Sequence, residues 1–150
     1  MTRDYQAKLA GLFRELSEHL LRKNPNDPKA HADLGLDLLS QGKLAEAERH
    51  FRAAIQTSPH FGVAHYRLGL LLRQQNRLTE ARTEFETALH LDPEDSKAHG
   101  NLGFIFLQQG ELGSAQSHFE SALRLNPDDA ISRTGLEETL QARSRLEKRN

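Results

Sequence analysis

Apolar residues recur along this chain at two intervals. At short range they lie three or four residues apart, which is the spacing of one face of an α-helix. In one such segment they are Leu44, Ala47, Phe51, Ala54 and Ile55. At long range the whole pattern returns every 34 residues without insertion or deletion. Phe51, for example, is followed by Phe85 and Phe119 at this spacing. A repeat of this length predicts stacked copies of one small helical unit, and it moves the search for function from a pocket to a surface.

Three consecutive frames, starting at residues 28, 62 and 96, carry the repeat. Ten columns hold the same residue in every frame: Ala30/Ala64/Ala98, His31/His65/His99, Leu34/Leu68/Leu102, Gly35/Gly69/Gly103, Gln41/Gln75/Gln109, Leu44/Leu78/Leu112, Ala47/Ala81/Ala115, Phe51/Phe85/Phe119, Ala54/Ala88/Ala122 and Pro59/Pro93/Pro127. Each frame contains two amphipathic segments. The residues at the break between them are Gly42, Asn76 and Gly110. Gly and Asn tolerate the left-handed backbone conformation that often ends a helix, so each frame is expected to be a helix-turn-helix unit.

Start and stop signals agree with this division. Asp27 precedes Pro28, which combines a capping side chain with a proline suited to the first helical turn. Asp95 and the pair Asp128-Asp129 offer caps to later helices. The recurrent prolines end each second helix, because proline cannot extend the hydrogen-bond ladder.

The small residues of the repeat have a steric explanation. Gly35 and Ala47 would let the two helices of a unit approach closely, and Phe51 would then fill the gap left between neighbouring units. Truncation of a fully buried Phe51 is expected to cost about 3–5 kcal/mol.

The two ends of the chain differ from the frames. Residues 3–24 carry Tyr5, Leu9, Leu12, Phe13, Leu16 and Leu20 at helical spacing. Because Pro25 precedes Pro59 by the same interval that separates Pro59 from Pro93, we interpret this segment as an N-terminal packing helix in the position of a preceding second helix. Residues 130–148 carry Ile131, Leu136 and Leu140 on an otherwise polar segment, which is typical of a C-terminal capping helix. We therefore expect eight helices in one domain, 1–150.

These residues resemble the tetratricopeptide repeat (TPR) family. A Leu-Gly pair followed by Ala, Phe, Ala and Pro occurs at Leu34-Gly35, Ala47, Phe51, Ala54 and Pro59 and returns in both later frames, which together cover residues 28–129. The chain departs from the family where a Trp is favoured, since that column holds His31, His65 and His99. The resemblance implies an all-α fold: a right-handed superhelix (α-α solenoid) of three tandem units, 28–61, 62–95 and 96–129.

Composition narrows the possible partners. Lys plus Arg number 20 and Asp plus Glu 21, so the formal net charge of −1 gives no general attraction for nucleic acid or an anionic membrane. No apolar run reaches the ~20 residues that span a bilayer, so direct membrane insertion is not expected. The absence of Cys excludes disulfides and thiolate chemistry. No signal peptide is visible at the start, and we expect a cytoplasmic protein.

Catalysis and metal binding find no support in the motifs. The chain has no Gly-rich phosphate loop and no nucleophile elbow. The column of His31, His65 and His99 is spread over helices that an intervening helix separates, whereas zinc needs several nitrogens at about 2.0–2.1 Å from one point. We expect these His to pack in place of an aromatic side chain. The prediction is a non-enzymatic protein without cofactor or metal.

Four arginines give the middle unit a basic character. Arg77 and Arg82 are best explained as solvated side chains balanced by nearby carboxylates. Arg67 and Arg73 lie on the first helix of the unit, where an anchor for an acidic peptide group and a solvated helix face are equally good interpretations.

The family resemblance also implies a concave groove lined by the first helix of each unit. The matching columns are Lys29/Val63/Lys97, Ala32/Tyr66/Gly100, Leu36/Leu70/Phe104, Leu39/Arg73/Leu107 and Ser40/Gln74/Gln108, bordered by Asp33/Arg67/Asn101. Many of these are apolar, and an exposed apolar strip is usually a binding site. A carboxylate clamp of the chaperone-binding type is doubtful, because its columns read Ala32, Leu36, Arg67, Lys97 and Asn101, of which only Lys97 fits.

The predicted function is therefore a scaffold or adaptor that binds a protein partner, as a peptide or amphipathic helix laid in this groove. The alternative is a structural assembly module, such as a homodimer, whose groove is occupied by a second copy.

Overall fold

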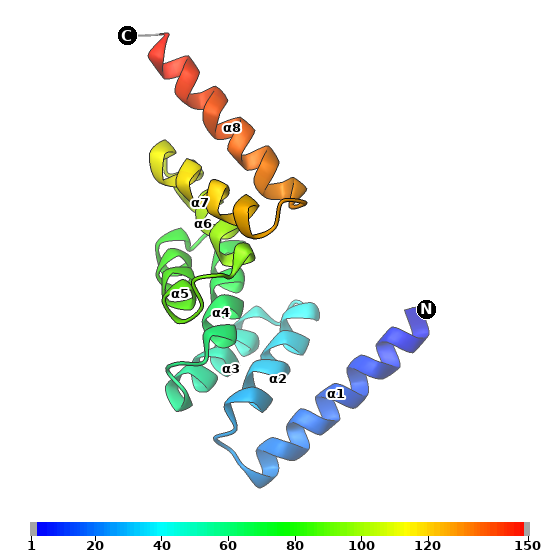
Figure 1. Ribbon diagram of the computed structural model, residues 1–150. Coiled ribbons are helices and arrows are strands. Elements are labelled where there is room, and N and C mark those ends of the chain that lie inside the picture. The colour runs from blue at the N-terminus through cyan, green and yellow to red at the C-terminus, as the bar shows by residue number, and fades with distance from the viewer. Residues whose placement is uncertain (1–2, 149–150) are drawn as a thin grey trace. The chain divides into compact units, whose positions relative to one another are not determined.

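The computed structural model describes the backbone of residues 3–148. In this range the regular secondary structure is all α-helix, joined by short loops (Figure 1). Side chains are described throughout except those of residues 3, 4, 6, 7 and 10. The helices of the described part are α1 (Arg3–Lys23), α2 (Pro28–Ser40), α3 (Leu44–Thr57), α4 (Gly62–Gln74), α5 (Leu78–Leu91), α6 (Ser96–Gln108), α7 (Leu112–Leu125) and α8 (Ala130–Glu147). The expected all-α fold with eight helices is confirmed.

The chain divides into two compact units, which are described separately below. The first unit is Met1–Arg77, with α1 to α4, and the second is Leu78–Asn150, with α5 to α8. The boundary falls inside the second sequence repeat, between its two helices. The single domain of three repeats therefore stays a prediction.

The predicted helix ends match the observed backbone. Gly42 and Gly110 have φ of 75° and Asn76 has φ of 59°, so all three breaks adopt the left-handed conformation that favours these residue types. The carboxylate of Asp27 accepts a hydrogen bond from the Ala30 backbone N–H at 2.8 Å, and Asp95 and Asp129 cap α6 and α8 in the same way.

The regular spacing of Gly and Phe sets the distance between paired helices. A Cβ atom added at Gly35 would lie 2.7 Å from the ring of Phe51, and one at Gly103 would lie 2.7 Å from the ring of Phe119. Both rings are fully buried. The close approach expected at Gly35 is thus observed, because only a residue without a side chain lets the ring lie directly on the helix backbone. The Phe51 ring lies on Gly35 of its own repeat, whereas the expectation placed it in the gap between neighbouring units.

One cluster in the core of the first unit is built from small side chains. Ala32, Ala54 and Ala64 are fully buried in one cluster, with Ile55 and Phe61 packed against it. At the surface of the same unit, Glu48 accepts hydrogen bonds from Arg77 at 2.7 Å and from Arg52 at 2.8 Å. The Arg77 interaction holds the pKa of Glu48 below its ordinary value, although partial burial of the carboxylate opposes the shift.

The orientation of α1 differs from the prediction. The helix packs against α2 (Figure 1), but most of its large apolar residues lie outside the contact face. Leu12, Phe13 and Leu16 are largely exposed, whereas Ser17 is buried. The interpretation as a packing helix is thus wrong about which face packs. The register explains it: Ser17 stands one repeat interval before Phe51, so the large ring that fixes this contact in the repeats is missing here.

The capping helix of the second unit shows a related difference. α8 packs against α6 and α7, as expected, but through Ser132, Gly135 and Thr139. The predicted contact residues Ile131 and Leu140 are exposed. The physical reason is the ring of Phe119, which lies against the backbone of Gly135 and leaves no room for a larger side chain on that face.

Candidate peptide-binding surface

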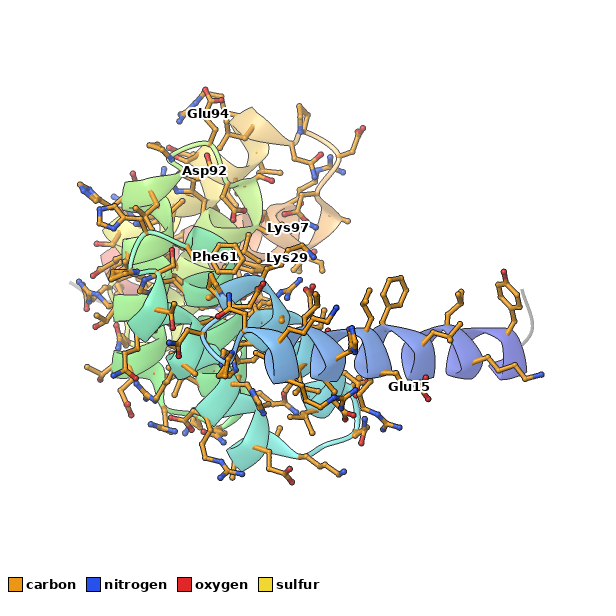
Figure 2. The ribbon with its side chains drawn as sticks, turned by 90° about the horizontal axis from the view of Figure 1, so that it is seen from below. Glu15, Lys29, Phe61, Asp92, Glu94 and Lys97 are labelled. Carbon is orange, nitrogen blue, oxygen red and sulfur yellow. The ribbon has the colours of Figure 1, made fainter. Side chains whose placement is uncertain are left out.

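Four of the predicted groove residues meet around one pocket in the first unit. Lys29 and Asp33 from α2, and Val63 and Arg67 from α4, line a depression of about 410 Å³. The remaining lining residues are Pro28, Ser58 and Phe61. Figure 2 labels Lys29 and Phe61, which carry the polar and the apolar sides of this pocket. The site thus combines a small apolar floor with charged groups at its rim.

The charges of this pocket form a connected group. Nη1 of Arg67 donates to the carbonyl of Ala32 at 2.9 Å and to Oδ1 of Asp33 at 3.2 Å. Nζ of Lys29 donates to Oδ2 of Asp33 at 2.8 Å. Partial burial would raise the pKa of Asp33, but the hydrogen bonds from Lys29 and Arg67 outweigh it and hold that pKa below its ordinary value. Asp33 is therefore a carboxylate at neutral pH, and two cations share it.

Arg67 consequently has a structural role in addition to any role in binding. Its bond to the Ala32 carbonyl ties α4 to α2 within the unit. The Lys29 side chain is different, because it is 80% exposed and its ion pair with Asp33 stays within one helix. Of the two cations, Lys29 is the one that can turn toward a ligand without loss of an interhelical contact.

The other predicted residues of the first unit lie outside this pocket. Leu36 on α2 is exposed, whereas Leu39, Tyr66 and Leu70 are half-buried. Arg73 is exposed near the end of α4. Ala32 is different: it is fully buried in the core cluster, so the expectation that its side chain lines an open strip does not hold.

In the second unit the predicted residues all lie on α6. Lys97 is exposed, and Asn101 donates to the Lys97 carbonyl at 2.8 Å. Phe104 is half-buried with its edge on the Phe119 ring, at a centroid distance of 4.9 Å, and Leu107 is also half-buried.

Gly100 is the exception on α6. It is buried, and a Cβ atom there would lie 2.8 Å from Oγ of Ser132, so this position provides the contact between α6 and α8. It is not available to line an open surface, which corrects the expectation for this column.

The His column has a specific structural role. Nε2 of His31 lies 2.8 Å from the carbonyl oxygen of Pro25, and His65 and His99 make the same contact with Pro59 and Pro93 at 3.0 and 3.2 Å. Since a carbonyl only accepts, Nε2 carries the hydrogen in each case. The column ties the first helix of each frame to the proline that precedes it, a hydrogen-bonding role that the sequence analysis did not predict.

Two of these His also pair with a second imidazole. Nδ1 of His31 lies 2.9 Å from Nδ1 of His50, and Nδ1 of His99 lies 3.1 Å from Nδ1 of His118. Burial, and then the charge of the paired His, lowers the pKa of both His50 and His118. In both pairs the two His are separated by the same number of residues. This spacing is the sequence signal for the pairs, and a comparison of identical columns does not reveal it. Within residues 3–148, no three His, Asp or Glu side chains converge to hold a metal ion.

The remaining arginines follow the simpler interpretation. Arg82 pairs with Glu86 at 2.8 Å and with Glu111 at 3.2 Å, and its guanidinium lies 4.3 Å from the ring centroid of Phe106. Arg77 pairs with Glu48, as described above. Both are surface side chains with carboxylate partners.

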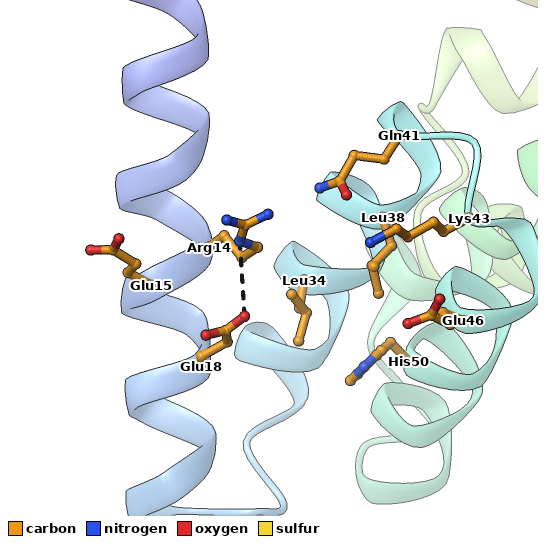
Figure 3. Close-up of a pocket in the computed structure, with 9 residues that line it drawn as sticks. All are labelled: Arg14, Glu15, Glu18, Leu34, Leu38, Gln41, Lys43, Glu46 and His50. Carbon is orange, nitrogen blue, oxygen red and sulfur yellow. Dashed lines mark ion pairs between the residues drawn. The ribbon is translucent and has the colours of Figure 1, made fainter.

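A second pocket, of about 470 Å³, lies between α1 and the α2–α3 hairpin (Figure 3). On α1 it is lined by Arg14, Glu15 and Glu18, of which Arg14 and Glu18 form a long ion pair at 3.9 Å. On the hairpin it reaches Leu34 and Leu38. Gln41, Lys43, Glu46 and His50 complete the lining on the hairpin, so polar and charged groups from both sides surround the two leucines.

The sequence did not reveal every residue of the candidate site. Phe61 and Ser58 lie in the loop between α3 and α4, outside the first-helix columns from which the groove was predicted. The available signal was Phe61 itself, which stands where the other two frames carry Asp27 and Asp95 as helix caps. A large apolar residue in a capping position indicates that it packs on something.

The regular helix pairs, their left-handed breaks and the absence of strands in the described residues define a helical-repeat protein. The Tetratricopeptide repeat family profile matches residues 14–60, 32–96 and 66–130, which together cover most of the chain. The chain belongs to the tetratricopeptide repeat family. Repeats of this family generally serve as interaction modules, and no catalytic family is indicated.

Solved structures support the same fold. The first TPR of Spaghetti (RPAP3) bound to the HSP90 peptide SRMEEVD is 20% identical, with a TM-score of 0.75 over 78% of this chain and 93% of that chain. The APC/C hetero-tetramer Cut9–Hcn1 contains a chain that is 19% identical, with a TM-score of 0.80 over 91% of this chain and 28% of that chain. No curated protein matches significantly. Among the described residues, no helix combines the length and the apolar character needed to cross a membrane.

Proposed function

We propose that this chain is a non-enzymatic adaptor that binds a short peptide or amphipathic helix over α2 and α4. The observation that carries the proposal is the pocket of Lys29, Asp33, Val63 and Arg67 with Phe61 at its floor. Exposed Leu36 and Val63 lie on the same two helices and extend the apolar surface available to a ligand. A partner would place one apolar side chain in the pocket and continue along these helices.

The charge of the pocket favours an acidic group beside that apolar side chain. Lys29 and Arg67 share the single carboxylate of Asp33, which leaves one unit of positive charge at the rim. Arg67 is held by the Ala32 carbonyl and presents further guanidinium donors in a fixed geometry. Lys29 is exposed and can swing to meet a carboxylate. The preferred ligand is therefore an apolar residue followed or preceded by Asp or Glu.

The proposed mode of binding differs from a carboxylate clamp. The first TPR of RPAP3 is bound to the peptide SRMEEVD, but at 20% identity the likeness concerns the fold. In this chain the clamp columns include Ala32, which is buried, and Leu36, which has no hydrogen-bond donor. SRMEEVD itself contains two apolar-acidic pairs, Met-Glu and Val-Asp, so we expect it to bind here only through such a pair and not through a clamp on its terminal carboxylate.

A selection experiment with a random peptide library tests this proposal. Peptides enriched on the full chain should carry an apolar residue next to an acidic one, and their binding should weaken as salt concentration rises. Val63→Glu should abolish binding of the enriched peptides, since it places a carboxylate at the pocket. Leu146→Glu, at an equally exposed leucine of α8, should bind them as the original chain does.

A charge reversal separates this pocket from general stickiness. Lys29→Glu should change the enriched motif from acidic to neutral or basic flanks, with helicity unchanged because the side chain is exposed. If Val63→Glu retains binding, or if Lys29→Glu leaves the motif unchanged, the pocket is not the binding site.

A further inference from the structure

The outer face of α1 is an apolar surface that nothing in its own unit covers. Tyr5, Leu12, Phe13, Leu16 and Leu20 are between 38% and 66% exposed, and together they define what we call the α1 stripe. The N-terminal half of the helix extends beyond α2 and α3 (Figure 2). Apolar side chains at this spacing normally mark the buried side of a helix. Here the polar side, with Ser17 and the Arg14–Glu18 pair, faces the hairpin.

The repeat register explains why this stripe lacks a partner. Positions 10–23 stand one repeat interval before α3, so α1 takes the place of the second helix of a repeat. In α3 the columns of Ala47 and Ala54 are fully buried, while in α1 the same columns hold Phe13 and Leu20. Columns that hold a small, buried side chain in a complete repeat thus hold a large, exposed side chain in α1. Larger apolar side chains at these positions favour a helix that approaches from outside the unit.

We propose that the α1 stripe binds the same stripe of a second copy, with the two helices antiparallel about a two-fold axis. The area is sufficient for such a pair. At about 200 Å² for a large apolar side chain, the exposed fractions leave roughly 500 Å² on each copy. Two copies would bury at most roughly 1,000 Å², the lower limit for a specific interface, so we expect a weak dimer that dissociates on dilution.

The charges beside the stripe fit this arrangement. Lys8 and Glu15 lie about two helical turns apart on one edge of the stripe. An antiparallel pairing that sets Leu12 opposite Phe13 of the second copy also brings Lys8 within one helical turn of the partner's Glu15, once on each side of the axis. A parallel pairing would set like charges at the same level. The net charge of −1 gives two copies little mutual repulsion.

The first experiment measures the mass of the full chain by sedimentation velocity over a range of concentrations. A concentration-dependent dimer is expected. Leu12→Glu with Leu16→Glu should give a monomer of unchanged helicity, whereas Leu146→Glu on α8 should still dimerise. A monomer at all concentrations overturns the proposal and leaves the stripe for a different partner or for another segment of a longer chain. Assemblies that grow beyond a dimer overturn the two-fold arrangement.

The second experiment tests the direction of pairing. Because the chain has no Cys, a single introduced Cys is the only thiol. Leu12→Cys should form a disulfide between copies under mild oxidation, because the two positions lie near the axis. Leu20→Cys should not, since antiparallel pairing separates the two positions by about 22 Å at about 1.5 Å of rise per residue. Cross-linking of both variants to the same extent would indicate parallel helices and overturn the proposal.

A charge exchange completes the test. Lys8→Glu should weaken the dimer, and Lys8→Glu combined with Glu15→Lys should restore it. Failure of the double variant to dimerise would exclude the Lys8–Glu15 pairing. This proposal does not rest on peptide binding, because the α1 variants should bind the selected peptides normally and Val63→Glu should dimerise normally.

Discussion

The ring of Phe119 lies between two glycines, and this arrangement predicts a change of sign in a double-mutant cycle. Gly103 on α6 and Gly135 on α8 both lie against the ring, and a methyl group at Gly135 would overlap with three of its carbons. The ring is fully buried and also contacts the edge of Phe104. It therefore has no free direction in which to move when Gly135 is enlarged.

The magnitudes follow from two opposing effects. Gly135→Ala gains about 1 kcal/mol of helix propensity, but the overlap with a ring that cannot move costs about 1–3 kcal/mol. The net result is a destabilisation of up to about 2 kcal/mol. Phe119→Ala alone should cost about 3–5 kcal/mol. In the Phe119→Ala background the overlap is gone, so Gly135→Ala should stabilise by about 1 kcal/mol.

Urea denaturation followed by far-UV circular dichroism gives the four free energies of unfolding. Hydrogen exchange read by mass spectrometry locates the change, which should appear in α6, α7 and α8. Gly113→Ala in α7 is the matched control, since no heavy atom lies within 4 Å of the added carbon, and it should stabilise equally in both backgrounds. If Gly135→Ala stabilises the chain with Phe119 present as much as it does in the Phe119→Ala background, the ring does not set the distance between α7 and α8.

Three further predictions concern titration, capping and backbone conformation. Burial is the main cause, and the charge of the paired imidazole the next, of a pKa below 6.5 for His50 and His118 in the folded chain. As the pH falls, the unfolded chain therefore binds more protons than the folded chain does. The free energy of unfolding should therefore be constant above about pH 6.5 and should decline toward pH 5. The double variant His50→Gln with His118→Gln should show a smaller decline when urea midpoints are measured over this range. An unchanged pH profile would contradict the role of these two His. Asp27→Ala should cost about 1 kcal/mol through loss of the cap on α2, while Asp27→Asn should cost much less; equal losses in thermal melts would mean that the cap is not the cause. Gly42→Ala should destabilise by about 1–2 kcal/mol because of its φ of 75°, and a neutral result in urea titration would show that the turn can adopt another conformation.

Features that repeat along the chain could be predicted from the sequence. The left-handed breaks, the caps at Asp27 and Asp95, and the contact of Gly35 with Phe51 each follow from one residue type in one local environment. Because the frames share one unbroken register, an error in one of them would have conflicted with the other two.

The two ends of the chain could not be predicted as well. Periodicity identifies an apolar face but does not say which neighbour covers it, so the face of α1 was assigned to the wrong side. The informative residue was Ser17, whose place in the Phe51 column shows that the regular contact is missing. On α8 the contact face consists of Ser132, Gly135 and Thr139, which hydropathy alone marks as a surface.

The candidate site was predicted in part for a similar reason. Lys29, Asp33, Val63 and Arg67 were found because they stand in first-helix columns, but the tie from Arg67 to the Ala32 carbonyl depends on the spacing of two helices. Phe61 was missed because it lies in a loop, where no periodicity points toward the pocket.

The bond from each column imidazole to a proline carbonyl has a consequence for acid tolerance. Nε2 donates to the carbonyl whether the ring is neutral or charged, so acidification does not break the strut between a proline bend and the helix after it. The opposite edge of the ring behaves differently. Nδ1 of His31 and Nδ1 of His50 form a hydrogen bond when only one of them carries a hydrogen, and they repel each other when both carry one. The two edges of the His31 ring therefore differ: Nε2 holds the helix to the proline bend, and Nδ1 takes part in the contact with His50.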